Sequence, residues 1–210
     1  KDLKKSLSVF EKILRNISDG VPARTIRFEK EDISIVNSLQ LLTSKPILYV
    51  CNVSESKAAK GNEFSSKVQE LVNFRNAKMV IISAVIEEEI SKLEDYDDAR
   101  LFLEDLGLEE PGLNRIINSG YNLLNLQTFF TVGPKEARAW TIPKGALAPE
   151  AAGRIHSDFE KGFIRAEIIS YEDYIKYEGE QGAKEAGKMK IEGKSYLVHE
   201  GDIIHVLFNL

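Results

Sequence analysis

Residues 44–55 read SKPILYVCNVSE, an apolar run followed by a polar turn. Five apolar residues, Ile47 to Cys51, come directly after Pro46. A short continuous apolar run is typical of a strand that is buried on both faces of a parallel sheet. The polar turn NVSE (52–55) comes next, and open α/β sheets bind ligands just past the carboxyl ends of their strands. The stretch therefore predicts a buried strand that leads into a binding loop.

A second strand of the same kind, Met79 to Ile82, is expected about one helix later and ends in Ser83-Ala84. Between the two strands, residues 63–75 place apolar side chains at helical spacing. The three segments predict a β-α-β unit, whose crossover is right-handed almost without exception. The two polar loops should then meet at one edge of the sheet.

An amphipathic helix is predicted for residues 1–18, which carry Leu7, Phe10, Leu14 and Ile17 at helical spacing. Such a helix needs a partner for its apolar stripe. Two interpretations remain open: a missing antiparallel partner helix, or an ordinary surface helix of the domain. Because the chain opens without Met inside this helix, we expect a fragment of a longer protein. Further helices are predicted over residues 31–42, 87–94, 96–106 and 111–125.

The pattern changes near Leu126. Residues 127–132 (QTFFTV) and 137–142 (ARAWTI) flank Gly133-Pro134 and predict a hairpin. A helix over 148–155, a strand over 163–169, a short helix over 172–177 and a last strand over 203–209 follow. Short strands are also expected at 190–192 and 196–198, on either side of a turn. This order suits a small α+β domain of the ubiquitin-like β-grasp kind.

The composition is that of an ordinary globular protein of 210 residues, 43% apolar and 29% charged, with a formal net charge of −5. No global basic excess indicates nucleic acid, so such binding needs a local patch. Cys51 is the single cysteine, which excludes an internal disulfide and fits a reducing compartment. No apolar run approaches the roughly 20 residues that span a bilayer. We expect a cytoplasmic protein without a membrane partner.

Asn52-x-x-Glu55 is the sharpest candidate site. An Asn side chain can brace a loop and touch a purine edge, and a carboxylate can accept from base N–H groups. Ser83 and Ala84 would offer backbone N–H groups from the other side. Taken alone, the pattern is too short to define a site, and an Asx-turn after a strand is the simpler interpretation.

A local basic surface interleaved with aromatics is the second candidate. Basic side chains beside aromatic rings suit an RNA backbone and stacked bases. The alternative is that the aromatics form the core and the charges a solvated face. The basic residues are Lys135, Arg138, Lys144, Arg154, Lys161 and Arg165; the aromatics are Phe129, Phe130, Trp140, Phe159 and Phe163.

Several other chemistries find no support in the residues. The P-loop pattern G-x-x-x-x-G-K-[ST] is absent, and Gly193-Lys194-Ser195 lacks its earlier glycine. No phosphate cradle or magnesium site can be assembled. Three histidines and one distant cysteine make no zinc set, and the adjacent His156-Ser157-Asp158 is no catalytic triad. We assign no catalytic and no metal-binding residue, and the acidic run Glu87–Glu89 is expected to be solvated.

Long stretches of the chain resemble the YchF family of Obg-related P-loop NTPases, called Obg-like ATPases in eukaryotes. These are LLTSKPILYVCNVSE, KGNEF, VIISA, residues 113–174 and GKSYLVHEGDIIHVLFN. The resemblance covers nearly the whole chain and is densest from Leu113 onward. It implies part of a helical coiled-coil insertion over 1–30, the C-terminal part of a nucleotide-binding G domain over 31–126, and a TGS domain of β-grasp fold over 127–210. It also implies that the P-loop, the magnesium ligands and the partner helix lie upstream of Lys1.

The resemblance assigns roles to the candidate residues. Residues 52–55 (Asn52, Val53, Ser54, Glu55) resemble the family's N-x-x-E, which replaces the N-K-x-D of ordinary GTPases and is associated with accepting ATP. Ser83 and Ala84 match the second base-side motif, whereas Val85 stands where many relatives of the wider class have Lys. The implied ligand is ATP or GTP with Mg, and the implied partner is the ribosome or its RNA. The whole protein would be a hydrolase, and this chain alone is predicted to be inactive.

Overall fold

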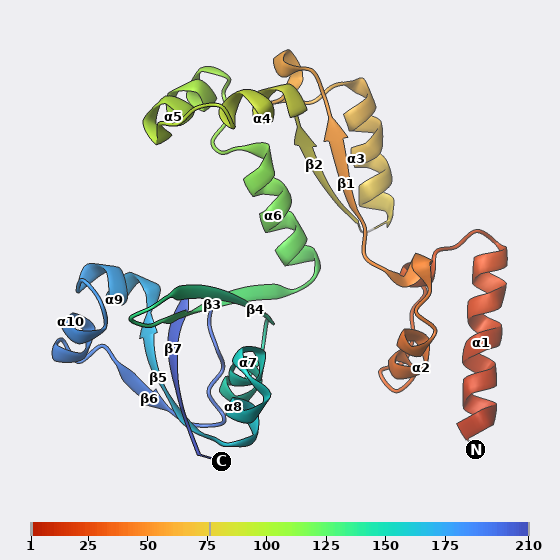
Figure 1. The fold of residues 1–210 in the computed structure, drawn as a ribbon. Coiled ribbons are helices and arrows are strands. Elements are labelled where there is room, and N and C mark those ends of the chain that lie inside the picture. The colour runs from red at the N-terminus through yellow and green to blue at the C-terminus, as the bar shows by residue number, and fades with distance from the viewer. Residues whose placement is uncertain (1, 76, 210) are drawn as a thin grey trace. The chain divides into compact units, whose positions relative to one another are not determined.

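The computed structural model describes residues 2–75 and 77–209, and the chain divides into two compact units, residues 1–123 and 124–210. Figure 1 shows their helices and strands. Within the described residues, none of the helices combines the length and the apolar character needed to cross a bilayer. Each unit is described by itself below.

The first unit opens with α1 (Asp2–Ser18), which packs on α2 (Ile33–Ser38) through Val9, Ile13 and Val36. The opposite stripe of α1 stays exposed and includes Leu7, Phe10 and Leu14. Helix α2 is shorter than the predicted 31–42 segment. Its end is followed by Gln40, whose φ of 47° is incompatible with a continuing helix.

The β-α-β unit of the first unit consists of β1 (Leu48–Asn52), α3 (Glu63–Arg75) and β2 (Lys78–Ile82). The two strands are parallel, with Leu48 opposite Lys78 and Asn52 opposite Ile82. The prediction of a strand buried on both faces was wrong for β1. No residue in it is fully buried, and Val50 is 45% exposed, because the outer edge of β1 has no strand partner among the described residues.

Three further helices complete the first unit, and α6 packs against both strands. A small core forms around Ile86, Leu103 and Leu108. The remaining elements are the helices α4 (Ala84–Ile90), α5 (Tyr96–Asp105) and α6 (Gly112–Leu123), and the short 3-10 turns η1 (Ala23–Thr25), η2 (Leu42–Ser44) and η3 (Glu55–Lys57).

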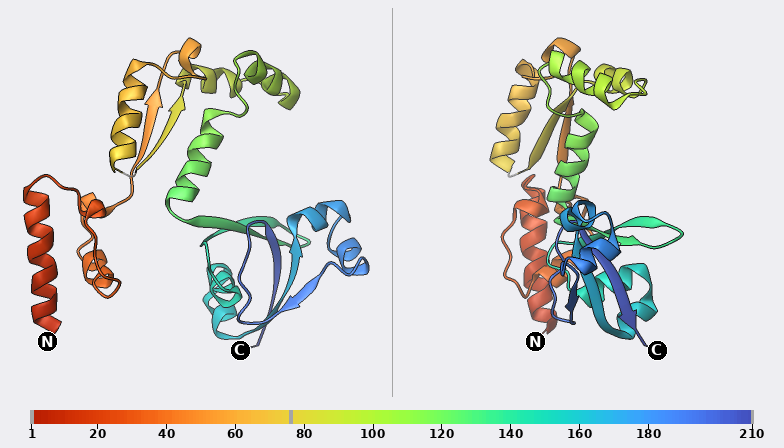
Figure 2. Two further views of the ribbon diagram at one scale, coloured as in Figure 1. Left: turned by 180° about the vertical axis from the view of Figure 1, so that it is seen from behind. Right: turned by 90° about the vertical axis from the view of Figure 1, so that its left-hand side faces the viewer.

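The second unit is built on a five-stranded mixed sheet in the order β4-β3-β7-β5-β6. The first strand, β3, is antiparallel to β4 and parallel to the last strand, β7. In Figure 2 the tip of the β3–β4 hairpin projects beyond the rest of the sheet. The strands are β3 (Leu126–Val132), β4 (Ala137–Pro143), β5 (Phe163–Ser170), β6 (Lys190–Glu192) and β7 (Asp202–Phe208).

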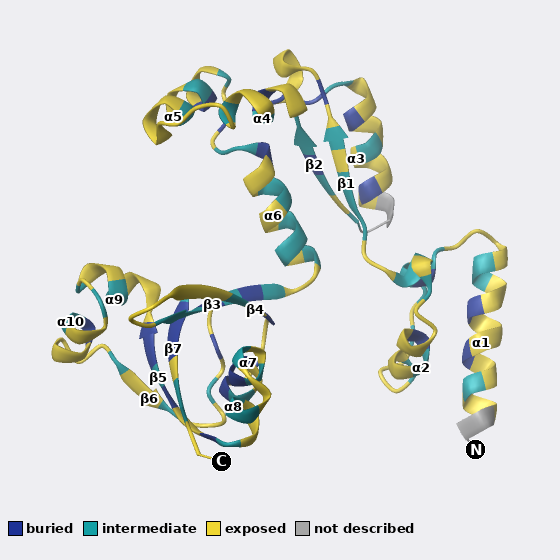
Figure 3. Ribbon diagram, viewed as in Figure 1, coloured by how far each residue is buried: buried dark blue, intermediate teal, exposed yellow. Residues whose placement is uncertain are grey.

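The core of the second unit lies between this sheet and the helices α7 (Ala148–Ile155) and α8 (Ser157–Lys161). Its centre contains Phe129, Ile142 and Ala152. Figure 3 shows the buried residues gathered on β5, β7 and α7. The other two helices, α9 (Tyr171–Lys176) and α10 (Glu180–Glu185), lie between β5 and β6 in the chain.

The predicted strand at residues 196–198 was wrong. This segment makes only an isolated bridge, Leu147 to Leu197, while β6 pairs with β5 instead. The backbone bonds of the segment go to the turn before α7. Ala148 N donates to Tyr196 O (2.9 Å) and Val198 N donates to Ala146 O (3.1 Å).

Candidate functional site

The two candidate loops follow the carboxyl ends of β1 and β2. Because the strands are parallel and in register to their last residues, Asn52 and Ile82 end side by side. The pairing continues one residue further, since Val53 N donates to Ile82 O at 2.8 Å. Val53 is buried and Asn52 is exposed. The sheet thus delivers both loops to the same edge.

A side-chain hydrogen bond joins the two loops at this edge. Asn52 Oδ1 accepts from the backbone N–H of Ala84 at 3.0 Å. Ala84 is the first residue of α4, where backbone N–H groups have no partner within the helix. Asn52 therefore caps this end of α4 from another strand. The bond also occupies one of the N–H groups that the sequence assigned to a ligand.

The Ser54-Glu55 segment presents a carboxylate to solvent. Glu55 opens η3, and its carbonyl accepts from Ala58 N at 3.0 Å, while Lys57 N donates to Ser54 O at 2.9 Å. Ala58 is 2% exposed and anchors the turn in the core. The Glu55 carboxylate itself has no hydrogen bond or ion pair with any residue in the described part of the chain. It is an acceptor held at the edge on an anchored turn.

Ser83 supplies an unsatisfied hydroxyl beside the Asn52–Ala84 bond. The residue is 2% exposed, and its Oγ has no hydrogen-bond partner among the described residues. A buried hydroxyl without a partner costs about 1–3 kcal/mol. Such a group indicates a place where a partner is expected. The next residue, Val85, is 48% exposed.

Two positioning features were not found from the sequence. The first is the turn before α3, where Asn62 N donates to Ser65 Oγ (2.8 Å) and Ser65 N donates to Asn62 Oδ1 (2.9 Å). Gly61 has φ of 76° and leaves no room for a Cβ, which would lie 2.9 Å from Ile81 Cδ1. The signal available was the Gly61-Asn62-x-x-Ser65 spacing, which matches a reciprocal helix cap.

The second feature is Glu87, which was predicted as part of a solvated run; that prediction was wrong. Its carboxylate accepts from Gly112 N (2.7 Å) and from Leu113 N (3.0 Å). A carboxylate is favourable at the positive N-terminal end of α6. A Cβ on Gly112 would lie 2.7 Å from both Glu87 Oε1 and Ile82 Cγ2. Glu87 thereby ties α4 to α6 beside the last residue of β2.

The six basic residues predicted to contact RNA do not form one cluster. Lys144 and Arg154 line the same small pocket, of about 260 Å³. Arg138 lies over the Trp140 ring, with its Cζ 4.1 Å from the ring centroid. Lys135 lies in the β3–β4 turn, Lys161 ends α8, and Arg165 neighbours the buried Ala166 on β5 and so faces the opposite side of the sheet.

The aromatic residues divide between core and surface. Phe129 is 0% and Phe163 is 3% exposed. The interpretation that RNA bases stack on these two rings was therefore wrong. Phe159 packs against the core and Phe208. Trp140 is half-buried and donates from Nε1 to Thr131 Oγ1 at 2.9 Å. On this hairpin, the exposed Arg138 side chain over the half-buried Trp140 ring is a combination of a cation and an aromatic ring that a ligand could reach.

Metal-binding groups are not brought together in the part of the chain that the structure describes, where no set of three His, Cys, Asp or Glu side chains is placed to hold an ion. The groups at the edge of β1 and β2 are an amide, a carboxylate and a hydroxyl. These groups are donors and acceptors suited to the edge of a nucleobase.

The parallel β-α-β unit and the mixed sheet define a protein of mixed α/β fold. A family model described as "YchF-GTPase_C: Protein of unknown function (DUF933)" matches residues 126–209. A curated protein of Pasteurella multocida, "Ribosome-binding ATPase YchF", is 50% identical over all 210 residues, which cover 57% of that relative. The Bacillus subtilis protein of the same name is 48% identical over 212 residues, covering 100% of this chain and 58% of the relative.

A solved structure agrees with these sequence relatives. "Structure of the Schizosaccharomyces pombe YchF GTPase" matches with a TM-score of 0.83 and 35% identity over 97% of this chain and 55% of that chain. The chain belongs to the YchF family and corresponds to the C-terminal part of its members. It spans somewhat more than half the length of the curated relatives that it matches.

Proposed function

We propose that this chain is the base-reading part of a YchF-type, ribosome-associated ATP/GTP-binding NTPase. In this proposal residues 52–55, together with Ser83 and Ala84, form the site of the purine base, and the Ala84 N–H holds Asn52 in place there instead of donating to the base. Residues 1–30 belong to a helical coiled-coil insertion, 31–126 to the nucleotide-binding domain, and 127–210 to a TGS domain. The parallel pairing of the first and last strands of the second sheet supports the β-grasp assignment.

The observation that carries the proposal is the 3.0 Å bond between Asn52 Oδ1 and Ala84 N. It fixes the loop after β1 to the loop after β2 at the carboxyl edge of a parallel sheet, where α/β folds bind ligands. The relatives' names, "Ribosome-binding ATPase" and "GTPase", support a nucleotide as that ligand.

Glu55 is the residue proposed to choose the base. Its carboxylate is an exposed acceptor without a partner among the described residues, and an amino group of adenine or guanine can donate to it. The hydroxyl of Ser83, the residue before Ala84, has no hydrogen-bond partner among the described residues. We expect it to bond Glu55 or the base when a nucleotide is bound, which would remove the cost of its burial.

The proposed ligand is ATP or GTP with Mg. No residue of this chain is assigned to the phosphates or to magnesium. We assign the groups at this edge to recognition, because none of them is a nucleophile that is hydrogen-bonded to a general base. We therefore expect no nucleotide hydrolysis by residues 1–210 alone, and turnover by this chain would contradict the proposal.

Adenosine binding by two matched variants tests the role of Glu55. We expect Glu55→Gln to weaken the affinity for adenosine about tenfold, the cost of replacing a hydrogen bond to a charged acceptor. Glu63→Gln is the control, since Glu63 is also exposed but pairs with Lys67 on α3. Equal affinities of Glu55→Gln and the unchanged chain, measured by equilibrium dialysis, would contradict the assignment.

A second candidate function is binding of ribosomal RNA through the TGS domain without nucleotide chemistry. It is favoured by Arg138 over Trp140 and by the presence of both Lys144 and Arg154 in the lining of one pocket. The test is the salt dependence of a gel shift with ribosomal RNA. The slope of log affinity against log salt is negative, and each lost phosphate contact reduces its magnitude by about 0.7 for single strands. Lys144→Met should reduce the magnitude of this slope, and the control Lys184→Met on α10 should leave it unchanged.

A further inference from the structure

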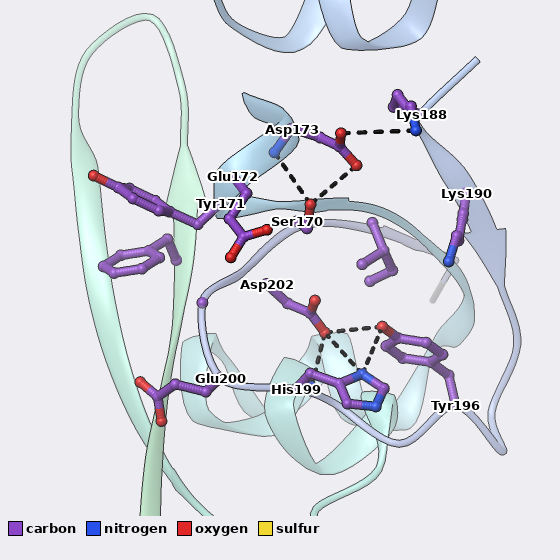
Figure 4. Close-up of a pocket in the computed structure, with 13 residues that line it drawn as sticks. Ser170, Tyr171, Glu172, Asp173, Lys188, Lys190, Tyr196, His199, Glu200 and Asp202 are labelled. Atoms are coloured by element: carbon purple, nitrogen blue, oxygen red, sulfur yellow. Dashed lines mark hydrogen bonds and ion pairs between the residues drawn. The ribbon is translucent and has the colours of Figure 1, made fainter. Parts of the chain in front are cut away.

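The second unit contains a pocket of about 810 Å³ that none of the assignments above uses. Its walls come from α9, β6 and the loop that leads into β7, with Ile168 and Phe130 from β5 and β3. Figure 4 shows the charged side chains that line it, grouped around the central space.

The floor of the pocket is a closed hydrogen-bond network around Asp202. This carboxylate is 5% exposed, and its Oδ2 accepts from Tyr196 Oη (2.9 Å) and from His199 N (2.8 Å). Burial and the bond to Asp202 raise the pKa of the Tyr196 phenol, so it remains the donor. The Asp202 Oδ2 atom is therefore already satisfied within the chain.

Most of the other charged groups are also occupied. Asp173 is 3.9 Å from Lys188 Nζ and accepts from Ser170 Oγ at 3.1 Å. Glu200 accepts from Thr128 N at 3.1 Å and 3.2 Å through its two oxygens.

Two opposite charges in the wall remain without a partner. Glu172 and Lys190 both line the pocket, yet neither makes a hydrogen bond or ion pair with any residue of the described ranges, including each other. Figure 4 places Glu172 on the α9 side and Lys190 on the β6 side of the space. One carboxylate and one ammonium group without a partner among the described residues thus line the same cavity from different elements.

An apolar surface lies beside Glu172. Phe130 and Tyr171 are in ring contact, with centroids 6.0 Å apart and planes tilted by 40°. Ile168 adds an aliphatic surface to the same pocket. Ring faces attract a cation as well as apolar groups, so this wall suits either an ammonium group or an apolar side chain.

We propose that this pocket binds a free α-amino acid with an apolar side chain. Its ammonium group pairs with Glu172, its carboxylate with Lys190, and its side chain packs on Phe130 and Tyr171. A zwitterion satisfies both unpaired charges at once. A nucleoside phosphate fits less well, because the lining has four carboxylates against two lysine ammonium groups.

The proposal is independent of the base-reading role of the first unit, since all the residues it uses lie within residues 124–210. It is tested by titrating the ¹⁵N-labelled 210-residue chain with L-phenylalanine. We expect amide shifts at Tyr171, Glu172 and Lys190. N-acetyl-L-phenylalanine lacks the ammonium charge and L-phenylalanine amide lacks the carboxylate, so both should bind about tenfold more weakly.

Variants of the two free charges complete the test. Glu172→Gln and Lys190→Met should each weaken L-phenylalanine binding about tenfold. Both side chains are exposed, as are those of the controls Glu180→Gln and Lys194→Met, which should bind as the unchanged chain does. Four results would overturn the proposal: no shifts at millimolar L-phenylalanine, equal binding of the acetylated analogue, unchanged binding by Glu172→Gln, or shifts with AMP but not with the amino acid.

Discussion

The two units of this chain differ in how their sheets are covered. In the second unit, a continuous core runs from Phe129 on β3 to Ile204 on β7 and is closed by α7 and α8. In the first unit, the sheet has two strands among the described residues, Val50 on β1 is 45% exposed, and the buried residues form small separate clusters. The carboxyl edge of β1 and β2 is therefore held in place mainly by hydrogen bonds and helix caps, whereas the sheet of the second unit is held in place by packing.

The largest expected effect follows from the core of the second unit. Phe129→Ala should lower the free energy of unfolding of this unit by about 3–5 kcal/mol, because it empties a fully buried site. The fluorescence of Trp140, the single tryptophan, reports this unit in a denaturant titration. Phe64→Ala on α3 is the counterpart in the first unit, where amide hydrogen exchange of α3 is measured because Trp140 lies in the other unit. Since Phe64 is 73% exposed, a change within about 0.5 kcal/mol is expected there, and comparable losses in both variants would contradict the contrast.

In the first unit the largest effect should come from a cap. Glu87→Ala removes the acceptor of two backbone N–H groups and should cost about 1–3 kcal/mol. Hydrogen exchange at Gly112 and Leu113 measures it directly and should accelerate. Glu89→Ala lies on the same helix and is exposed. If it accelerated exchange equally, the cap would not be the cause.

A smaller effect is expected at the candidate site. Asn52→Ala leaves Ala84 N without its acceptor and should destabilise the joined loops by about 1 kcal/mol. The Ala84 amide should then exchange faster. Asn52→Asp keeps an acceptor oxygen and should retain most of the protection. Loss of protection in both variants to the same degree would show that the bond does not hold the loops together.

The smallest effect concerns pH and belongs to the second unit. In the folded state, burial and the bond to Asp202 raise the pKa of Tyr196 above its ordinary value of 10.0. The protonated phenol is thus favoured by folding. Its contribution is complete below about pH 10 and is lost as the pH rises above that value. The free energy of unfolding should fall more steeply in the unchanged chain than in Tyr196→Phe, and parallel curves would contradict this.

Much of the fold could be predicted from local patterns. The apolar run before Asn52, the helical spacing over 63–75 and the Gly133-Pro134 turn each depend on neighbouring residues, and the corresponding elements are present. The errors concern long-range contacts. The exposure of Val50 depends on which strands flank β1, and the pairing of β6 depends on β5 rather than on the nearby turn.

The candidate site shows the same division. The loops after β1 and β2 were expected at one edge, and the parallel register brings them there. Their connections could not be predicted, because the Ala84 N–H and the Glu87 carboxylate find their partners 32 and 25 or more residues away. The roles of Asn52, Glu55 and Ser83 toward a base stay predictions.

The most direct test of the account is a map of where a nucleobase binds. We expect adenosine, titrated into the ¹⁵N-labelled 210-residue chain, to shift the amide signals of residues 52–55 and 83–84, and Asn52→Ala to weaken these shifts. Adenosine is the probe because it has no phosphate, so it isolates base reading. Absence of shifts at millimolar adenosine, or shifts confined to residues 124–210, would contradict the central claim that the edge of β1 and β2 reads the base.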